Sequence, residues 1–336
     1  MRENPASILF ETINGFHRTA AIKSAIDLDL VTALSEGCTS VPALARRCRG
    51  SHRGIKILCD YLTSLGFLAK TGSEYHATAV SLMFLSRTSR AYIGDVVEFL
   101  ASPAMMAQFQ DLTSVIREGR LAGGKDGTVP SHPLWRQFAK AMGCVMSPVA
   151  ERVARILGAH RAVEPWNVLD MAAGHGLFGI AIARLNRNAR VVALDWPEVL
   201  DVAVQNAEAA GLNGRYEILG GDARSIELTS HYDLVLLTNF LHHFSAATCA
   251  EILGKVHRAL RPGGRAALLE YVTDEEEEHL EPAAAACALT MLGITPEGNV
   301  YTRREYEDWL RSAGFSTVVW DVAEPSDQLV IIAGKA

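Results

Sequence analysis

The chain has 336 residues, with 32 Lys and Arg against 38 Asp and Glu, which gives a formal net charge of −6. Hydrophobic residues make up 49% and charged residues 21%, an ordinary globular composition that excludes disorder, collagen and coiled coil as descriptions of the whole chain. The mild acidity argues against a protein that coats nucleic acid or anionic lipid.

The cysteine usage points to a reduced compartment. The six cysteines are scattered, without a CxxC pair or the Cys/His spacing of a zinc site. Residues 1–14 carry charge throughout instead of the basic-then-apolar pattern of a signal peptide, and no apolar run reaches membrane-spanning length. We therefore expect a soluble, cytoplasmic protein that does not contact a membrane.

The first hundred residues read as helices followed by a small hairpin. Residues 20–34 have apolar side chains at helical spacing, and a second apolar stripe lies between Ser51 and Gly66. Two short β-rich segments, 67–69 and 75–77, enclose a Thr-Gly turn. Helix, turn, helix and two-stranded wing is the order of a winged-helix domain, which we assign to residues 1–100.

Two functions compete for this winged helix. DNA binding requires a basic, outward-facing second helix, but this helix offers only Arg53 and Lys56, with Asp60 nearby. The sequence therefore disfavours nucleic acid as a partner. A dimerisation and substrate-lid module is the favoured interpretation, and since its helices expose more apolar surface than 100 residues can bury alone, we expect a homodimer.

Residues 101–160 are predicted to form a helical linker that contributes to the substrate pocket. A glycine cluster at 123–127 interrupts it. The stretch 134–156 is amphipathic, and such a stripe either packs in the core or lines a ligand pocket, where adaptable methionine is useful. The candidate substrate-binding residues on one side of this stretch are Phe138, Met142 and Met146.

From residue 161 to 336 the pattern alternates strand and helix, which predicts an α/β domain with a doubly wound, mostly parallel sheet. The final region, 316–333, adds two strands joined by a short link, so that pair is expected to be antiparallel and the sheet seven-stranded. The first five strands are expected at 168–171, 191–195, 216–219, 234–237 and 266–270.

Polar and small residues follow the ends of these strands. The loop from Asp170 to Gly176 is rich in small residues, which let the backbone turn sharply and approach a ligand. Asp195 closes the second strand and can accept hydrogen bonds from both hydroxyls of a ribose, although it could instead cap the helix that begins after Trp196. After the third strand, Asp222 can accept a hydrogen bond from an exocyclic amine, so this position is suited to binding adenine.

The fourth strand leads into the segment 236–244, which contains the pair His242-His243. A Pro262-Gly263-Gly264 turn precedes the fifth strand. With these motifs the chain resembles, over nearly its full length, the class I S-adenosylmethionine-dependent small-molecule O-methyltransferases. The resemblance is to the caffeate and hydroxyindole type, which carries an N-terminal winged-helix dimerisation domain.

This resemblance implies S-adenosyl-L-methionine as cofactor and S-adenosyl-L-homocysteine as product. It places one group of residues at the methionine side, Asp195 at the ribose, and Asp222 with Ala223 at the adenine. The methionine-side residues are Asp170, Ala172, Gly174 and Gly176. Further members of the implied cofactor site are Trp196, Thr238 and Asn239.

The resemblance further implies that His242 is the catalytic base and that Glu270 orients it. A phenol is a poor nucleophile at neutral pH until a positioned base removes its proton, and imidazole is suited to that task. His243 replaces the Asp that commonly follows the base in this family, so it remains open as an alternative base or as a substrate contact. Met291 lies in a segment that covers the substrate in this family, and it is assigned to substrate binding.

Several alternatives remain open at this stage. A dehydrogenase would share the glycine-rich turn, but the paired histidines favour methyl transfer. Methylation of nitrogen or carbon, or a non-methylating reaction on the same cofactor, would use the same fold. A regulator that binds DNA through the winged helix is the least favoured. No metal is expected, because the acidic residues near the site are too few and too separated to form an oxygen-ligand cluster.

Overall fold

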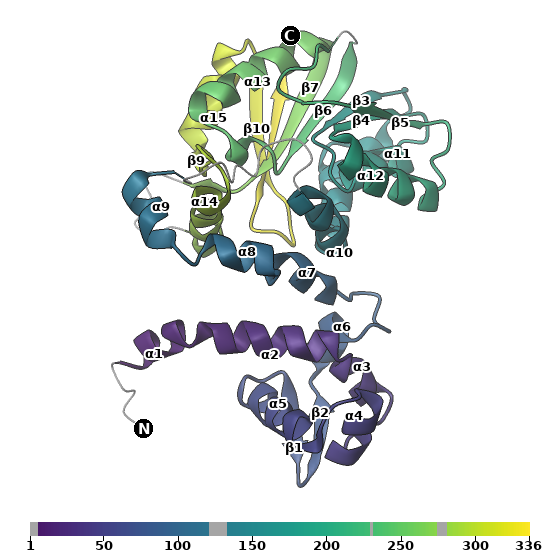
Figure 1. Cartoon of the computed structure of the whole chain (residues 1–336). Coiled ribbons are helices and arrows are strands. Elements are labelled where there is room, and N and C mark those ends of the chain that lie inside the picture. Colours follow the sequence, from purple (N-terminus) through teal and green to yellow (C-terminus); the bar gives the residue numbers. More distant parts are fainter. Residues whose placement is uncertain (1–5, 121–132, 229–230, 274–280) are drawn as a thin grey trace. The chain divides into compact units, whose positions relative to one another are not determined.

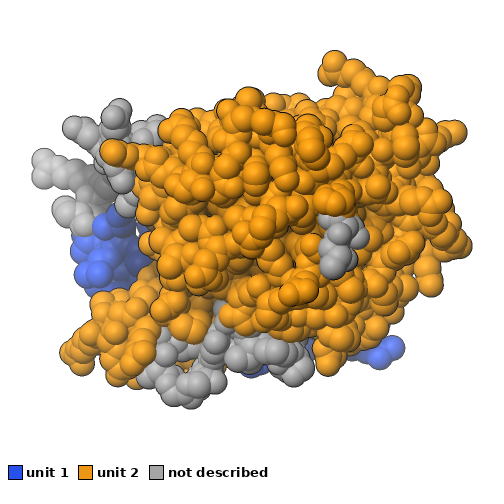
Figure 2. Space-filling view, turned by 90° about the horizontal axis from the view of Figure 1, so that it is seen from above, with its two compact units in different colours: residues 1–106 blue, residues 107–336 orange. Residues whose placement is uncertain are grey.

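The computed structural model describes residues 6–120, 133–228, 231–273 and 281–336 (Figure 1). The chain forms two compact units, residues 1–106 and 107–336, which are coloured separately in Figure 2. The predicted glycine-rich crossing at 123–127 lies outside the described residues, and the division of the sequence at residues 100 and 160 stays a prediction. Among the described helices, none is both long and apolar enough to span a bilayer.

The first unit consists of helices and one hairpin, in the predicted order. The strands β1 (Leu68–Thr71) and β2 (Glu74–Ala77) pair antiparallel and form the wing. The apolar faces of helices α2 to α5 share one core with the hairpin, and this core includes the fully buried Leu30 and Leu44. The helices are α1 Ser7–Ile13, α2 Gly15–Asp27, α3 Leu30–Ser35, α4 Val41–Arg47, α5 His52–Ser64, α6 Ala79–Leu85 and α7 Val97–Leu100, and α8 Pro103–Gln108 follows.

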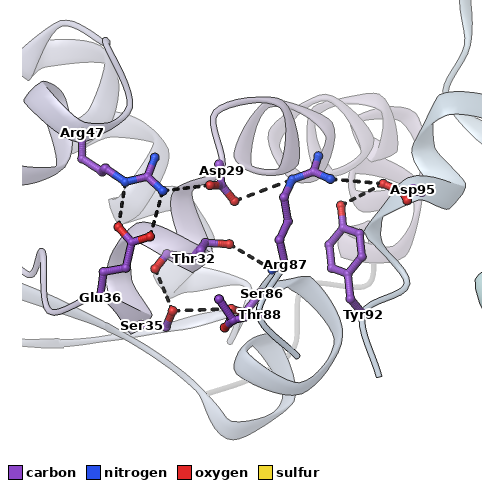
Figure 3. A network of polar contacts seen from close by, with 10 residues as sticks. All are labelled: Asp29, Thr32, Ser35, Glu36, Arg47, Ser86, Arg87, Thr88, Tyr92 and Asp95. Atoms are coloured by element: carbon purple, nitrogen blue, oxygen red, sulfur yellow. Dashed lines mark hydrogen bonds and ion pairs between the residues drawn. The ribbon is translucent and has the colours of Figure 1, made fainter. Parts of the chain in front are cut away.

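The single helix predicted over residues 20–34 was wrong, because the chain breaks between α2 and α3 at Asp29. Asp29 has a left-handed backbone (φ 54°), a conformation that Asp tolerates better than most residues. Its carboxylate lies 3.0 Å from the guanidinium of Arg47 and 3.7 Å from that of Arg87 (Figure 3). The apolar spacing continues across the break, so periodicity carried no signal of it.

The second unit contains the predicted seven-stranded sheet, with strand order β10-β11-β7-β6-β3-β4-β5. Strands β7, β6, β3, β4 and β5 are parallel, and β11 joins antiparallel to both β7 and β10, as the short link between β10 and β11 predicts. The strands are β3 Asn167–Met171, β4 Arg190–Asp195, β5 Tyr216–Gly220, β6 Tyr232–Thr238, β7 Leu260–Glu270, β10 Thr317–Val322 and β11 Leu329–Gly334. A short parallel pair, β8 Val272–Thr273 and β9 Tyr301–Thr302, lies outside this sheet.

Helices cover both faces of the sheet, which confirms the doubly wound architecture (Figure 1). One apolar core joins the sheet to α13 and α15, and a second joins it to α10, α11 and the end of α12. The helices of this unit are α9 Leu112–Glu118, α10 Pro133–Ile156, α11 Leu177–Leu185, α12 Pro197–Ala209, α13 Ala246–Ala259, α14 Pro282–Ile294 and α15 Arg303–Ser312.

The segment Pro262–Gly264, predicted as a turn before the fifth strand, lies inside β7 in the structure. The pairing of β6 with β7 jumps from Tyr232–Leu260 to Leu234–Arg265, and Gly263 has a left-handed backbone (φ 74°). The strand therefore continues through an irregularity, which glycine accommodates without a steric penalty.

Candidate active site

The candidate site lies at the carboxyl edge of the sheet, where the order of the strands reverses. Strand β3 lies between β4 and β6, so the loops that follow β3 and β6 leave the sheet at its topological switch point. In open α/β sheets this is the position at which ligands bind. Both loops begin with a non-glycine residue in the left-handed region, Ala172 (φ 57°) and Asn239 (φ 54°).

The loop after β3 needs glycine for two separate reasons. Gly174 and Gly176 both have a left-handed backbone, with φ of 56° and 72°. At Gly176 a Cβ would also lie 2.9 Å from the Cβ of Ala203 and would overlap the hydroxyl of Tyr216, whereas at Gly174 no atom lies within 4 Å of that position. Gly176 therefore lets the loop pack closely against Ala203 and Tyr216, whereas the space beside Gly174 is open.

Asp195 links this loop to the end of β4. Its Oδ2 accepts a hydrogen bond from the backbone N–H of Gly174 (2.7 Å), and its Oδ1 accepts one from the N–H of Trp196 (2.7 Å). Burial raises the pKa of the Asp195 carboxyl to about 6. The residue at the N-cap of α12 is Trp196, so Asp195 does not have the capping role that was its structural alternative.

Asp170, at the end of β3, is fully buried. Its Oδ2 accepts a hydrogen bond from the N–H of Gly179 (2.9 Å), while within the described part of the chain its Oδ1 is buried without a hydrogen-bond partner. Burial, with a smaller contribution from the nearby Asp195, raises the pKa of this carboxyl to about 7. S-adenosylmethionine carries an ammonium group and ribose hydroxyls, which are hydrogen-bond donors. The acceptor set of Asp170 and Asp195 therefore fits this cofactor.

In the segment after β5, Asp222 is hydrogen-bonded to Arg224, a residue that the sequence analysis did not single out. The carboxylate of Asp222 accepts hydrogen bonds from the backbone N–H of Arg224 (2.8 Å) and from its guanidinium (Nη2, 2.9 Å). These bonds lower the pKa of the Asp222 carboxyl even though burial opposes that change. Ala223 is buried, and its carbonyl accepts a hydrogen bond from Lys255 (3.1 Å). Arg224 was not anticipated from the sequence, because no motif marked it.

The structure brings His242 and Glu270 together. His242 lies in the short helical turn η3 (Leu241–His243) after β6, and Glu270 ends the neighbouring strand β7. The Nδ1 of His242 lies 2.5 Å from Oε2 of Glu270, and both side chains are buried. The other oxygen, Oε1, accepts hydrogen bonds from the backbone N–H groups of Phe240 (3.0 Å) and Leu241 (2.8 Å). Both oxygens of this carboxylate are thus used to hold the histidine turn.

His243 has a different environment. Its Nδ1 lies 3.0 Å from the carbonyl oxygen of Phe240, so Nδ1 donates to that oxygen. Burial, together with the neighbouring His242, lowers the pKa of His243 to about 3. Its ring packs edge-on against Trp135 of α10 (centroids 4.9 Å apart), and Trp135 packs edge-on against Phe138 (6.2 Å). The predicted substrate residue Phe138 is thus connected to the histidine turn through Trp135, which the sequence analysis did not single out.

The remaining predicted residues occupy three settings. Thr238, the buried last residue of β6, pairs with Leu269 of β7. The side chain of Asn239 contacts the sulfur of the buried Met146 (Nδ2 to Sδ, 3.9 Å), which places one predicted substrate residue at the edge of the sheet. The partly buried Met142 packs against the core between α10 and the sheet.

The buried Met291 lies on α14, and a series of hydrogen bonds through Thr295 and the segment after it leads from Met291 to the histidine turn. The carbonyl of Met291 accepts from the hydroxyl of Thr295 (2.7 Å), Thr295 accepts from the N–H of Gly298 (2.8 Å), and the N–H of Asn299 donates to the carbonyl of His242 (2.9 Å). The roles of Met142 and Met291 in substrate binding stay predictions.

The fold and these loops define an enzyme of the methyltransferase type, and comparison with known proteins identifies the family. A model of the O-methyltransferase domain matches residues 131–316, and a model of the O-methyltransferase dimerisation domain matches residues 10–87. The chain belongs to the O-methyltransferase family. Because this family is S-adenosylmethionine-dependent, the cofactor expected from the sequence is confirmed.

Individual relatives span nearly the whole chain. A 3-hydroxy-5-methyl-1-naphthoate 3-O-methyltransferase of Streptomyces sahachiroi is 27% identical over 321 residues, which cover 93% of this chain and 90% of its own. A crystal structure provisionally assigned to the O-methyltransferases, from Nostoc punctiforme, is 42% identical and superposes with a TM-score of 0.91 over 99% of both chains. Human N-acetylserotonin methyltransferase in complex with SAM shares the fold, with 23% identity and a TM-score of 0.84 over 100% of this chain and 99% of its own.

Proposed function

We propose that this enzyme transfers a methyl group from S-adenosylmethionine to a hydroxyl of a small aromatic or polyketide-like molecule, with His242 as the general base. The observation that carries this proposal is the short contact between Nδ1 of His242 and Oε2 of Glu270. A carboxylate oxygen can only accept, so Nδ1 holds its hydrogen toward Glu270. The lone pair at Nε2, on the other side of the ring, is then the base.

The pKa of its neighbour supports the choice of His242. His243 has a pKa lowered to about 3, so its ring binds a proton too weakly to act as an efficient base near neutral pH. Its Nδ1 donates to the neutral carbonyl of Phe240 and not to a carboxylate, which supports a protonated ring less than Glu270 supports that of His242. We assign His243 to substrate contact, together with Trp135, against which it packs.

The reaction balances with the groups present. When bound, S-adenosylmethionine supplies an electrophilic methyl group on a sulfonium leaving group. Nε2 of His242 takes the proton of the acceptor hydroxyl, the oxygen gains the methyl group, and the products are a methyl ether and S-adenosylhomocysteine. Glu270 stabilises the protonated imidazole until the proton passes to solvent. Holding the oxygen and the methyl group in line supplies much of the remaining acceleration.

The acceptor class rests on the side chains near the histidine turn and on the relatives. Trp135 packs against His243 and Phe138 against Trp135, while Met146 contacts Asn239. Together with Met142 and Met291, whose place in the pocket is a prediction, these apolar and aromatic side chains suit a planar apolar molecule. Two relatives are named as O-methyltransferases of such compounds, the naphthoate enzyme above and the tetracenomycin polyketide synthesis 8-O-methyltransferase of Streptomyces glaucescens. The second of these is 26% identical over 332 residues, which cover 97% of this chain and 96% of its own.

A direct test combines a product screen with a variant. The purified enzyme is incubated with S-adenosylmethionine and a panel of phenols and naphthols, and mass spectrometry detects the gain of one methyl group. Fragmentation then assigns that group to oxygen, nitrogen or carbon. We expect an O-methyl product that His242→Ala suppresses and that His76→Ala, a change of an exposed histidine in β2, leaves unchanged. A product methylated on nitrogen or carbon would contradict the proposal.

We also infer that two copies of the chain associate through the N-terminal unit. The matched dimerisation domain covers residues 10–87 of this unit. Helices α1 and α2 expose large apolar side chains to an extent that is unusual for a monomer surface. These side chains, with exposed fractions of 57–74%, are Ile8, Leu9, Phe10, Ile13 and Phe16.

A further inference from the structure

Asn239 is the residue through which the chain passes from strand β6 to the turn that carries His242. Its backbone is left-handed (φ 54°), which is uncommon for any residue other than glycine. Its N–H donates to the carbonyl of Leu269 (2.9 Å), and the next two N–H groups donate to Oε1 of Glu270. The direction in which the turn leaves the sheet therefore depends on the conformation of this one residue.

The side chain of Asn239 is held at both ends. Its Oδ1 accepts a short hydrogen bond from Nε2 of Gln328, and its Nδ2 points to the sulfur of Met146 (3.9 Å). These contacts fix which end of the carboxamide faces which neighbour. The carboxamide of Asn239 connects three segments of the protein, and its role in cofactor binding stays a prediction.

Gln328 is fully buried, and its own orientation is fixed. Its Oε1 accepts a hydrogen bond from the hydroxyl of Ser326 (3.1 Å), so its Nε2 is the end that faces Asn239. Its carbonyl accepts from the N–H of Ala323 (3.1 Å), which closes the turn between β10 and β11. A buried glutamine is costly unless its carboxamide is satisfied, and here the satisfied carboxamide reaches the catalytic edge.

The register of the sheet explains how a residue so distant in sequence reaches this place. Leu329, the first residue of β11, pairs directly with Glu270, the last residue of β7. Gln328 immediately precedes Leu329, so its backbone lies at the end of β7, next to the pair formed by Leu329 and Glu270. Both supports of the histidine turn, Glu270 and Gln328, thus come from neighbouring antiparallel strands.

We propose that Gln328 is a positioning residue for the reaction: through Asn239 it sets the start of the histidine turn, and with it the direction of Nε2 of His242. This inference rests on the proposed role of His242 as base. Removing the Nε2 donor lets Asn239 relax from its left-handed conformation. The imidazole then loses its alignment with the acceptor hydroxyl, while the glycine-rich loop after β3 and the Asp195 site keep their own hydrogen bonds.

The test uses Gln328→Leu and Gln328→Met, which keep the size of the side chain and remove the donor. We expect kcat to fall roughly tenfold in both variants, since small misplacements of a catalytic group have effects of this order or larger. The affinity for S-adenosylhomocysteine, measured by calorimetry, stays within about twofold, because Asp170, Asp195 and the glycine-rich loop after β3 keep their own hydrogen bonds. A parallel loss of kcat and of this affinity would overturn the proposal, and so would an unchanged kcat.

A double-mutant cycle separates positioning from general damage to the fold. If Gln328 acts through His242, then Gln328→Leu causes no further loss of kcat in a His242→Ala background. An equal loss in both backgrounds overturns the inference and leaves His242 as base. If His242→Ala itself has no effect, the proposed function fails first, and the two failures are thereby distinguished.

The link through Asn239 has its own test. Asn239→Gly permits the left-handed backbone without the side chain, whereas Asn239→Ala removes the side chain and keeps the steric penalty. We expect both to lower kcat, with Ala the more damaging, and we expect Gln328→Leu to add nothing to Asn239→Gly. An additive loss in that pair would show that Gln328 acts by another route.

Discussion

The Nδ1 atom of His242 lies 2.5 Å from Oε2 of Glu270, across the ends of two neighbouring parallel strands. Glu270 also accepts two backbone N–H groups of the turn that carries the histidine. One carboxylate therefore fixes both the backbone and the ring, which suits a base that must present a single nitrogen to its substrate.

Replacing His242 by Ala should lower kcat by about a hundredfold or more, the usual contribution of a general base. Cofactor affinity should be nearly unchanged, because Asp195 and Asp170 belong to other loops. The loss should shrink as the pH approaches the pKa of the phenol, since the acceptor then ionises without help. A pH series of kcat for wild type and variant measures this, and a loss that is constant with pH would contradict the role as base.

Replacing Glu270 by Gln should also lower kcat. The retained oxygen of the amide can still accept from Phe240 and Leu241, but its NH2 group would face Nδ1 of His242 and donate to it. The imidazole would then carry its hydrogen at Nε2, where the base is needed, so we expect a loss of at least about tenfold. Calorimetry with S-adenosylhomocysteine is the control, and activity close to wild type would argue against the orientation described here.

The raised pKa of Asp170 predicts how the ligand-free enzyme responds to pH. Below the ordinary value of 3.8 the carboxyl is protonated in both the folded and unfolded states, and above about 7 it is ionised in both. Between these values only the folded state keeps the proton, so stability falls as the pH rises through this window. Asp170→Asn should therefore raise the melting temperature at pH 8 by about 2 °C or more relative to wild type.

The matched control for that experiment is Asp308→Asn, which changes an exposed carboxylate on α15. Its melting temperature should follow wild type at every pH. If Asp170→Asn melts below wild type at pH 8, the buried carboxylate contributes more through its bond to Gly179 than its ionisation costs.

The two glycines of the β3 loop should respond differently to alanine. Gly174→Ala meets only the penalty of a left-handed backbone, because the space around it is open. Gly176→Ala meets the same penalty and in addition overlaps Tyr216 and Ala203. The affinity for S-adenosylhomocysteine should fall by at least about tenfold for Gly176→Ala and by less for Gly174→Ala. Equal losses would mean that backbone conformation alone matters.

The proposed dimer has a direct measurement in light scattering. At micromolar concentration the wild type should have the mass of two chains. Ile13→Glu should shift it toward one chain, because a charge on the exposed apolar face of α1 opposes burial. Glu11→Gln, on the same helix, should remain a dimer, and a single-chain mass for the wild type would exclude this association.

The strands and helices of the second unit could largely be predicted from the sequence, because buried parallel strands are apolar runs that alternate with helices. The loop residues at their carboxyl ends follow from that order, which is how Asp170, Asp195 and the pair of histidines were found. The contact of Glu270 with His242 was expected from the family resemblance, and the pairing of β6 with β7 brings the two residues together.

Other members of the site depend on geometry that local patterns do not carry. Gln328 reaches Asn239 only because β11 pairs with β7 in one register, and a buried glutamine in a turn resembles any polar turn residue in sequence. Trp135 meets His243 through the packing of α10, and Arg224 pairs with a carboxylate two residues before it. At the break between α2 and α3, the carboxylate of Asp29 pairs with two arginines that lie 18 and 58 positions later in the chain, Arg47 and Arg87.

The position of β11 has a consequence for how the protein is made. This strand follows every other strand of the sheet in the chain, yet it is inserted between β7 and β10. While the ribosome synthesises the chain, the N-terminal unit and most of the parallel strands can fold, but β7 presents an open edge until β11 emerges. The nascent enzyme therefore completes the β7 side of its sheet, and with it the hydrogen bond from Gln328 to Asn239, only after β11 has emerged.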